Sequence, residues 1–307
     1  MSAAPKTPST PPDERMPVTL PQLAEKKRLG EPIVMVTAYD YPSAQVAEES
    51  SVDMVLVGDS AAMTVLRYSS TVPVSVDELI MLAAAVRRGL RTPFMVADLP
   101  FGSYEASNGQ AIATAQRFIK EAGADAVKLE GGGAMVERAR AIIRAGIPVQ
   151  GHVGLTPQTA IALGGYKAQG RTAHRALDVA RDALALQEVG CFSLVFEAIP
   201  AAVSVLVVER MEVPIIGIGA GPATDGQVLV FHDLLGIYDG LSPRFAKRYA
   251  NVKQDMIAGV SAYANEVRAG RFPAPEHTYS IDPEELESFT ARLPEFASAE
   301  RLARFDW

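Results

Sequence analysis

Short apolar runs recur along the chain and alternate with stretches that have the composition of helices. The runs are rich in Val, Ile and Leu and do not alternate with polar residues, which is typical of parallel strands buried on both faces. A short interval without a clear helical pattern precedes the last of them. We predict eight strands, at Ile33–Ala38, Met54–Val57, Phe94–Ala97, Ala126–Leu129, Ile147–Gln150, Phe192–Phe196, Pro214–Ile218 and Val228–Phe231.

Helix-compatible segments separate these strands, and several of them end in glycine, as helices commonly do before a strand. Strands that alternate with helices form either a closed barrel or an open doubly wound sheet. Eight units within about 200 residues favour a (β/α)8 TIM barrel, a fold of about 250 residues. The helices that we predict most directly from the pattern are Val76–Arg88, Asn108–Glu121, Ala134–Arg144 and Arg175–Glu188.

The two ends of the chain differ from this repeat. Residues 1–17 are rich in Pro, Ser and Thr and lack the apolar segment of a signal peptide, so we predict a disordered leader. Residues 18–272 form the predicted barrel and catalytic domain, in which residues 244–268 would provide closing helices. Residues 273–307 form an acidic C-terminal extension, and we expect the end of the chain to be helical rather than part of the sheet.

Composition narrows the function classes. The net charge of −7 and the pI near 5.3 argue against nucleic acid or an anionic membrane surface as a partner. No apolar run approaches the roughly 18–20 residues that span a bilayer. The single cysteine, Cys191, excludes an internal disulfide and disfavours a cysteine metal site. A small-molecule enzyme in the cytoplasm fits these observations.

Polar residues follow the predicted strands closely, and in a barrel such strand ends meet at one mouth. They are Asp40, Asp59, Asp98, Glu130, His152 and Glu197. A single Asp after a strand usually caps the next helix. Several carboxylates at one mouth repel each other, however, and burying them costs several kcal/mol each unless they are paired or bind a cation. The set as a whole therefore indicates a functional site.

We predict that Asp59, Asp98 and Glu130 bind a divalent metal ion. Hard oxygen donors with no cysteine and few histidines favour Mg²⁺ or Mn²⁺ over Zn²⁺. Such an ion would keep positions open for a bidentate substrate. The alternative is that these three residues only cap helices at the mouth.

Three further strand-end residues are candidates for chemistry. Lys128 lies two positions before Glu130, so both side chains point into the barrel; the lysine could hold a substrate carboxylate, form an ion pair or act as a Schiff-base nucleophile. His152 could donate to a substrate oxygen or be structural. Glu197 ends an apolar run, and an apolar setting suits a general base, although it could instead cap the helix near Ala201.

A glycine-rich segment at residues 164–171 follows the fifth predicted strand and carries Lys167 and Arg171. Such a segment could be a lid that clasps an anionic ligand. It could equally be a solvated loop.

The combined motifs resemble those of the ketopantoate hydroxymethyltransferase family. The resemblance runs in order from about Val18 to His277 and is carried by Thr-Ala-Tyr-Asp-Tyr (37–41), Val-Gly-Asp-Ser (57–60), Ala-Asp-Leu-Pro-Phe (97–101), Val-Lys-Leu-Glu-Gly-Gly (127–132), Gly-His-Val-Gly-Leu-Thr-Pro-Gln (151–158), Gly-Gly-Tyr-Lys (164–167), Gln-Gly-Arg (169–171) and Gly-Ile-Gly-Ala-Gly (217–221). It implies a barrel of the phosphoenolpyruvate/pyruvate superfamily that assembles as a homodecamer. The implied reaction transfers a hydroxymethyl group from 5,10-methylenetetrahydrofolate to 3-methyl-2-oxobutanoate, giving 2-dehydropantoate in pantothenate and coenzyme A biosynthesis.

The resemblance also implies roles for individual residues. It implies Mg²⁺ at Asp59, Asp98 and Glu130, and a Mg-stabilised enolate. It implies substrate contacts at Asp59, Ser60, Asp98 and Lys128, and places His152 in the lining of the active site. Glu197 corresponds to the proposed proton acceptor.

Three other functions remain open from the sequence. A 2-oxo acid lyase of the same superfamily would use the same metal ligands and enolate chemistry without folate. An aldolase could instead form a Schiff base at Lys128. A catalytically inactive barrel could serve as a scaffold or binding protein.

Overall fold

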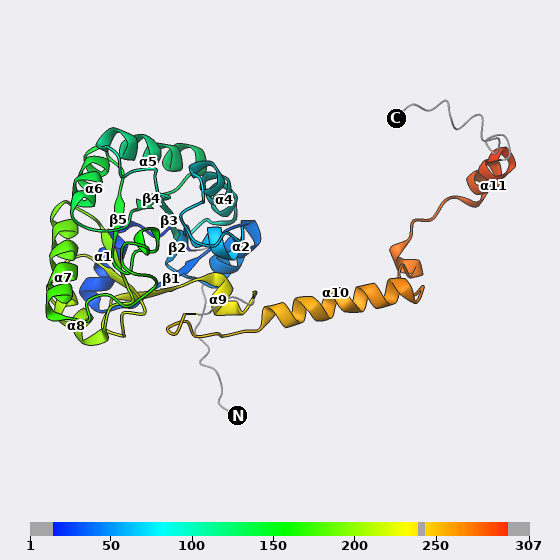
Figure 1. Cartoon of the computed structure of the whole chain (residues 1–307). Helices are drawn as coiled ribbons and strands as arrows, with labels where there is room; N and C mark the ends of the chain where they lie inside the picture. The colour runs from blue at the N-terminus through cyan, green and yellow to red at the C-terminus, as the bar shows by residue number, and fades with distance from the viewer. Residues whose placement is uncertain (1–14, 239–242, 294–307) are drawn as a thin grey trace. The chain divides into compact units, whose positions relative to one another are not determined.

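The computed structural model of the protein describes residues 15–238 and 243–293. Its strands pair in parallel in the order of the chain, and β1 also pairs with β8, which closes the barrel. The helices between the strands form an outer ring around them (Figure 1). The predicted TIM barrel is therefore confirmed, and the open doubly wound sheet is excluded. The strands are β1 (Ile33–Thr37), β2 (Met54–Val57), β3 (Phe94–Asp98), β4 (Ala126–Lys128), β5 (Val149–Gly154), β6 (Ser193–Glu197), β7 (Ile215–Ile218) and β8 (Gly226–Leu229).

Most elements begin and end within two residues of the prediction, but β5 does not, and β8 is shifted as a whole. β5 begins after Pro148, which has no N–H to donate to a ladder, and continues to Gly154 rather than ending at Gln150. β8 lies two residues earlier than predicted, because Val230 already caps the next helix. The helices are α1 (Leu20–Leu29), α2 (Tyr41–Glu49), α3 (Ala61–Thr64), α4 (Val76–Gly89), α5 (Asn108–Ala122), α6 (Ala134–Arg144), α7 (Ala173–Glu188), α8 (Ala201–Val208), α9 (Phe231–Leu235), α10 (Val252–Arg268) and α11 (Pro283–Arg292), with short 3-10 turns η2 (Pro157–Thr159) and η3 (Pro275–His277).

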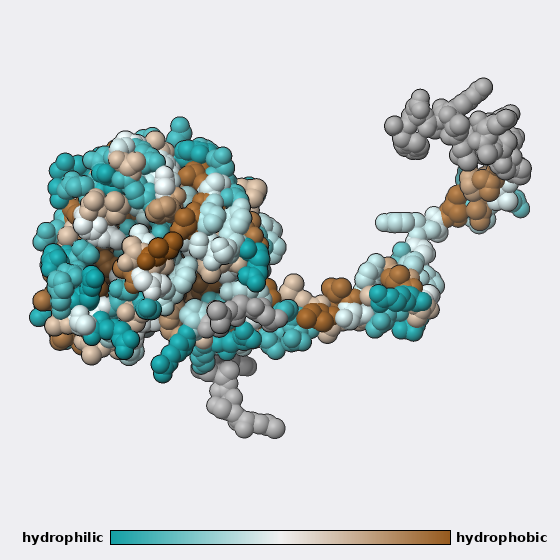
Figure 2. Space-filling view, in the orientation of Figure 1, coloured by the Kyte–Doolittle hydropathy of each residue, from teal (hydrophilic) through white to brown (hydrophobic). Residues whose placement is uncertain are grey.

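The ends of the chain differ in part from the prediction. Residues 1–14 of the predicted leader and residues 294–307 of the predicted extension lie outside the described residues. The last part of the leader is held, because the Arg15 guanidinium pairs with Glu48. The chain divides into two compact units at Asn251–Val252, earlier than the expected boundary at residue 272. Residues 244–268 were predicted to form closing helices, but only the part from Val252 onward is helical, and it belongs to the second unit. There α10 exposes apolar side chains (Figure 2).

Apolar side chains pack in two layers on either side of the barrel wall. One cluster fills the inside of the barrel with alternate residues of the strands, and Leu23 of α1 is part of it. The larger cluster lies between the strands and the surrounding helices. Because side chains alternate between the two faces of a strand, the residues that continue the inner layer toward the strand ends must point into the mouth.

At the end of the barrel opposite the mouth, where the strands begin, aspartates connect neighbouring strands by hydrogen bonds. Each of three aspartates directly precedes an even-numbered strand and accepts a hydrogen bond from a backbone N–H of the neighbouring odd-numbered strand. These bonds satisfy backbone donors that would otherwise be unpaired where the ladder begins. They run to Asp53 from Val34 at 2.8 Å, to Asp125 from Met95 at 2.8 Å and to Asp225 from Ile215 at 2.8 Å.

Candidate active site at the barrel mouth

The two-residue period of the strands carries the predicted site residues to the mouth. On β3 the inner residues Phe94 and Val96 are followed by Asp98, and on β4 the inner residue Ala126 is followed by Lys128. On β6 the inner residue Val195 is followed in the same way by Glu197. These polar side chains therefore form the layer above the apolar interior of the barrel.

Strand register brings Lys128 against carboxylates. Asp98 and Lys128 are direct partners in the β3–β4 ladder, and the Lys128 Nζ lies 2.9 Å from Asp98 Oδ1 and 3.8 Å from Glu130 Oε1. All three side chains are at most 4% exposed. The lysine is thus a buried cation shared between two carboxylates of neighbouring strands.

His152 lies between two further carboxylates. Its Nδ1 is 3.3 Å from Glu130 Oε1, and its Nε2 is 3.4 Å from Glu197 Oε2. Burial and the nearby Lys128 lower the pKa of His152, but the two carboxylates outweigh them and raise it to about 9. The imidazole thus lies between Glu130 and Glu197, and the Lys128 Nζ lies 3.3 Å from its Nδ1.

Asp59 reaches the cluster through a turn rather than through the strand period. Gly58 continues the inner layer of β2, and a Cβ there would lie 2.8 Å from the Ser60 Oγ, so the tight turn requires glycine. The Asp59 N–H donates to Asp98 Oδ2 at 2.9 Å. The Asp59 carboxylate accepts a hydrogen bond from the Gln158 amide at 3.0 Å.

Helix capping does not explain these carboxylates, except at Asp40. The Asp40 side chain accepts a hydrogen bond from the Ser43 N–H and caps α2, so Asp40 is a capping residue. The N-cap residues of α3, α6 and α8 are Ser60, Gly133 and Pro200. Asp59, Asp98, Glu130 and Glu197 are therefore not N-caps, and the capping alternative proposed for them is wrong.

The charges of the cluster are unequally balanced. Burial raises the pKa of Asp59 well above its usual range, and the negative charges of Glu130 and Asp98 raise it further. Burial also raises the pKa of Asp98, although Lys128 opposes this effect. The pKa of Glu130 is lowered, because His152 and Lys128 outweigh its burial. The charged form is thus disfavoured at Asp59 and Asp98 and favoured at Glu130.

This distribution suits a divalent cation. The Asp98 Oδ1 is buried and faces the Lys128 ammonium at 2.9 Å, and carboxylates are the ligands that Mg²⁺ prefers. Among residues 15–238 and 243–293, no three Asp, Glu, His or Cys side chains are already arranged to hold a metal ion. Mg²⁺ is commonly bound by only one or two carboxylates together with water and substrate, so the donors fit the ion without a complete protein cage.

Lys128 is poorly suited to form a Schiff base. Burial lowers its pKa, but the carboxylates of Asp98, Glu130 and Asp59 more than compensate and raise it above the usual range. A Schiff base requires a neutral amine as the nucleophile. The structure therefore favours a role for Lys128 as a charged anchor.

The sequence analysis missed three residues of the site, namely Tyr39, Tyr104 and Gln158. The Tyr39 hydroxyl is buried and lies 2.8 Å from the Oγ of Ser60, which was predicted. Tyr104 and Gln158 are buried beside Glu130. The only sequence signal for Gln158 is its place in the Thr-Pro-Gln motif after the fifth strand.

The loop after β5 covers part of the mouth. Its Tyr166 hydroxyl lies 3.9 Å from the Met63 sulfur. Partial burial, and to a lesser extent the charges of Asp59, Glu130 and Glu197, raise the pKa of Tyr166. The Tyr166 side chain is 54% exposed. This loop, predicted as a lid or a solvated loop, thus places an accessible aromatic ring above the carboxylates.

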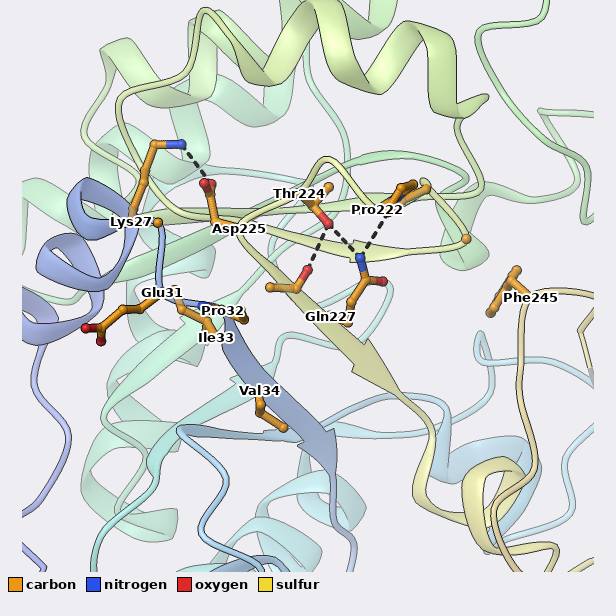
Figure 3. A pocket seen from close by; sticks show the side chains of 14 residues that line it. Lys27, Glu31, Pro32, Ile33, Val34, Pro222, Thr224, Asp225, Gln227 and Phe245 are labelled. Atoms are coloured by element: carbon orange, nitrogen blue, oxygen red, sulfur yellow. Dashed lines mark hydrogen bonds and ion pairs between the residues drawn. The ribbon is translucent and has the colours of Figure 1, made fainter. Parts of the chain in front are cut away.

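A separate hollow lies away from this cluster. It has a volume of about 860 Å³ and lies on the outer wall of the barrel, beside β1 and β8 (Figure 3). The Gln227 amide on its wall donates to Thr224 and to the Gly221 carbonyl. Because none of its lining residues belongs to the carboxylate cluster, we do not assign the chemistry to it.

Comparison with known proteins identifies the family. The sequence profile of the family described as ketopantoate hydroxymethyltransferase matches residues 17–275. A 3-methyl-2-oxobutanoate hydroxymethyltransferase of Moorella thermoacetica is 54% identical over 266 residues, which are 87% of this chain and 99% of that protein. The chain belongs to the ketopantoate hydroxymethyltransferase family. The resemblance found in its motifs is thereby confirmed.

Solved structures of more distant proteins share the fold. A 2,3-dimethylmalate lyase, a member of the PEP mutase/isocitrate lyase superfamily, matches with a TM-score of 0.55 and 15% identity, over 94% of this chain and 99% of that chain. A phosphonopyruvate hydrolase in complex with oxalate and Mg²⁺ matches with a TM-score of 0.55 and 13% identity, over 94% of this chain and all of that one. At these identities the likeness concerns the fold alone. In the part of the chain that the structure describes, no helix is both long and apolar enough to cross a membrane.

Proposed function

We propose that this protein transfers a hydroxymethyl group from 5,10-methylenetetrahydrofolate to 3-methyl-2-oxobutanoate, giving 2-dehydropantoate on the route to pantothenate and coenzyme A. Membership of the family supports the reaction. The observation that carries the assignment to this site is the buried mouth cluster, where Lys128 lies among carboxylates and His152 faces Glu197. A 2-oxo acid needs a cation for its carboxylate and a base for its C3 proton, and the cluster offers both.

Lys128 and Ser60 bind the carboxylate end of the 2-oxo acid in this proposal. The lysine is permanently charged because its acidic neighbours hold the proton on it. Buried charge pairs are strong where water is excluded. The Tyr39 hydroxyl, 2.8 Å from the Ser60 Oγ, orients the serine toward the mouth.

Glu197 accepts the C3 proton of the bound 2-oxo acid. Its neighbour His152 lies 3.4 Å away, so an imidazole nitrogen faces the carboxylate and fixes its position. The following residue, Ala198, has a left-handed φ of 49° and is held by two backbone hydrogen bonds, to Ile218 and from Gln169. A non-glycine residue in this conformation is strained, and the strain is consistent with precise placement of Glu197.

Asp59, Asp98 and Glu130 are the residues that would hold Mg²⁺. When bound, the ion would supply Lewis-acid stabilisation of the negative charge that develops on the 2-oxo group as C3 loses its proton. Burial and the neighbouring carboxylates raise the pKa of Asp59 and Asp98, and a bound cation would offset both effects.

The enolate carbon then forms a bond to the methylene carbon of the folate, and a bond between that carbon and a folate nitrogen breaks. Water supplies the hydroxyl group as the second carbon–nitrogen bond is replaced, so that tetrahydrofolate leaves. Tyr166 is positioned to cover the pterin, because its ring is accessible above the cluster and aromatic rings stack favourably.

Incubation of the protein with 3-methyl-2-oxobutanoate, 5,10-methylenetetrahydrofolate and Mg²⁺ tests the proposal. We expect 2-dehydropantoate by mass spectrometry, and its loss with EDTA. Well-folded protein that forms no product would overturn the assignment of the reaction. Borohydride with substrate serves as the control for the rival aldolase, because covalent trapping at Lys128 would demonstrate a Schiff base.

We further propose a cytoplasmic homodecamer, as the family resemblance implies. Light scattering coupled to size-exclusion chromatography should give ten times the 32.7 kDa mass of the chain. A monomeric mass would contradict the assembly without affecting the chemistry of the mouth.

A further inference from the structure

Gln158 connects two carboxylates that come from different strands. It lies in η2, at the start of the loop after β5, and is 4% exposed. Its backbone N–H donates to Glu130 Oε2 at 3.0 Å, and its side-chain Nε2 donates to Asp59 Oδ2 at 3.0 Å. Asp59 follows β2 and Glu130 follows β4, so β3 separates the two strands. One residue therefore bridges two like charges that are not neighbours in the barrel.

The orientation of the Gln158 amide is fixed by the groups around it. The Nε2 also faces the Leu99 carbonyl at 2.9 Å, and a carbonyl can only accept. The amide oxygen therefore points away from Asp59 and accepts from the Tyr104 hydroxyl at 2.6 Å. The Tyr104 oxygen in turn accepts from the Glu130 N–H at 3.3 Å, so both hydrogens of the amide group and its oxygen have partners.

Charge explains why an amide is required at this position. Glutamate would place another carboxylate against the buried Asp59 carboxylate, in place of a donor at 3.0 Å. A leucine would leave the buried Asp59 carboxylate without its side-chain donor, and a buried polar group without a partner is destabilising. Only a neutral group that both donates and accepts satisfies Asp59, Leu99 and Tyr104 together.

We propose that Gln158 is a positioning residue that holds Asp59 and Glu130 in place for a divalent cation, with Tyr104 fixing the orientation of its amide. The inference rests on the proposed function, because that function gives the carboxylates a cation to hold. Gln158 itself does not touch the reacting atoms. It also ties the first turn of the loop that carries Tyr166 to the carboxylates, so the mouth and its cover share one hydrogen-bond network.

The variants Gln158→Leu and Tyr104→Phe separate this role from general stability. Groups that orient metal ligands typically account for 10–100-fold in metal affinity, so we expect Gln158→Leu to raise the Kd for Mn²⁺ by about that factor. Tyr104→Phe removes the hydroxyl that orients the amide and that also accepts from the Glu130 N–H, and we expect a rise of about tenfold, the lower end of the same range. In the Gln158→Leu background, Tyr104→Phe should have a smaller effect than in the wild type, because residues in one network are not additive.

The measurement is a titration of full-length protein with Mn²⁺, in which free Mn²⁺ is followed by electron paramagnetic resonance, together with melting curves without metal. Gln227→Leu is the matched control, since the Gln227 Nε2 also donates two hydrogen bonds but on the outer wall of the barrel (Figure 3). We expect wild-type Mn²⁺ affinity from this control.

A Kd within twofold of wild type in folded Gln158→Leu would overturn the inference, and so would additive effects of the two variants. If Gln158→Leu does not fold, Tyr104→Phe decides alone, and an unchanged Kd overturns the inference. Product formation by the wild type is measured separately. Absence of product with normal Mn²⁺ binding would count against the proposed function only, whereas normal product with no effect of Gln158→Leu would count against this inference only.

Discussion

Replacing Lys128 by methionine perturbs the balance of charge in the mouth most directly. Methionine keeps most of the volume of the side chain and removes the ammonium group. Asp98 and Glu130 would then be buried with only His152 as a neighbouring cation. We predict a large loss of stability at pH 7 that a divalent cation partly restores.

The distances give the size of the effect. At an effective dielectric constant of 20, unit charges at the 2.9 Å and 3.8 Å separations of Lys128 from Asp98 and Glu130 attract by about 6 and 4 kcal/mol. Desolvation of the ions offsets much of this, and removal of one partner from a buried pair costs about 3–5 kcal/mol. For a protein of this size, such a loss lowers the Tm by about 6–20 °C.

The pH dependence of the loss has a defined sign. The pKa of Lys128 is raised, so its stabilising contribution is fully present at pH 7 and disappears only as the pH rises through that raised value. At acid pH the carboxylates become protonated and no longer need the cation. The pKa of Asp59 and of Asp98 is raised. As the pH is lowered, the difference in Tm between the variant and the wild type should therefore begin to shrink at a higher pH than it would if these carboxylates had ordinary pKa values.

Calorimetric melting of the Lys128→Met variant between pH 4 and 8, with and without Mg²⁺, measures these effects. Lys26→Met is the matched control, because Lys26 lies at the same 2.9 Å from Asp53 but the two side chains are 28% and 14% exposed. Exposed pairs contribute about 0–1 kcal/mol. A Lys128→Met variant that melts no lower than Lys26→Met, or that gains nothing from Mg²⁺, would refute the reasoning.

Three further predictions concern single residues. Glu197→Gln should lower kcat by about 10²–10⁴-fold, as expected for a lost general base, while Mn²⁺ binding is retained; near-normal turnover would reject Glu197 as the base. Burial raises the pKa of Cys191 to about 12, so iodoacetamide should modify it only in denaturant, and rapid labelling of native protein would contradict its burial. Burial opposes ionisation of Glu48, but the amides of Arg91 and Thr92 lower its pKa overall. The stability lost in Glu48→Gln should therefore be present at pH 7 and shrink below about pH 4; a constant loss across this range, measured by denaturant unfolding, would argue against it.

The part of the site that lies on strands could be predicted from the sequence. Asp98, Lys128 and Glu197 continue the inner layer of their strands, and a period of two together with a closed barrel is sufficient to bring them to one mouth. Asp40 was grouped with them wrongly as a strand-end acid. Its Pro and Ser two and three residues later are the marks of a helix start, and the structure confirms that it caps α2.

The part of the site that lies on loops could not be predicted in the same way. Gln158 and Tyr104 are 54 residues apart and meet only because two loops fold over the mouth. No local periodicity relates such residues, and loop conformation depends on contacts distant in the sequence. The eighth strand was misplaced for a related reason, because β8 is set by its pairing with β1 and β7 rather than by an apolar run of its own.

A crystal structure with Mn²⁺ and 3-methyl-2-oxobutanoate is the most direct test of the account. We predict one anomalous peak at the mouth, within bonding distance of carboxylate oxygens from Asp59, Asp98 or Glu130, with the Lys128 ammonium beside the substrate carboxylate. Substrate covalently joined to Lys128, or bound substrate with no metal peak near these carboxylates, would contradict it.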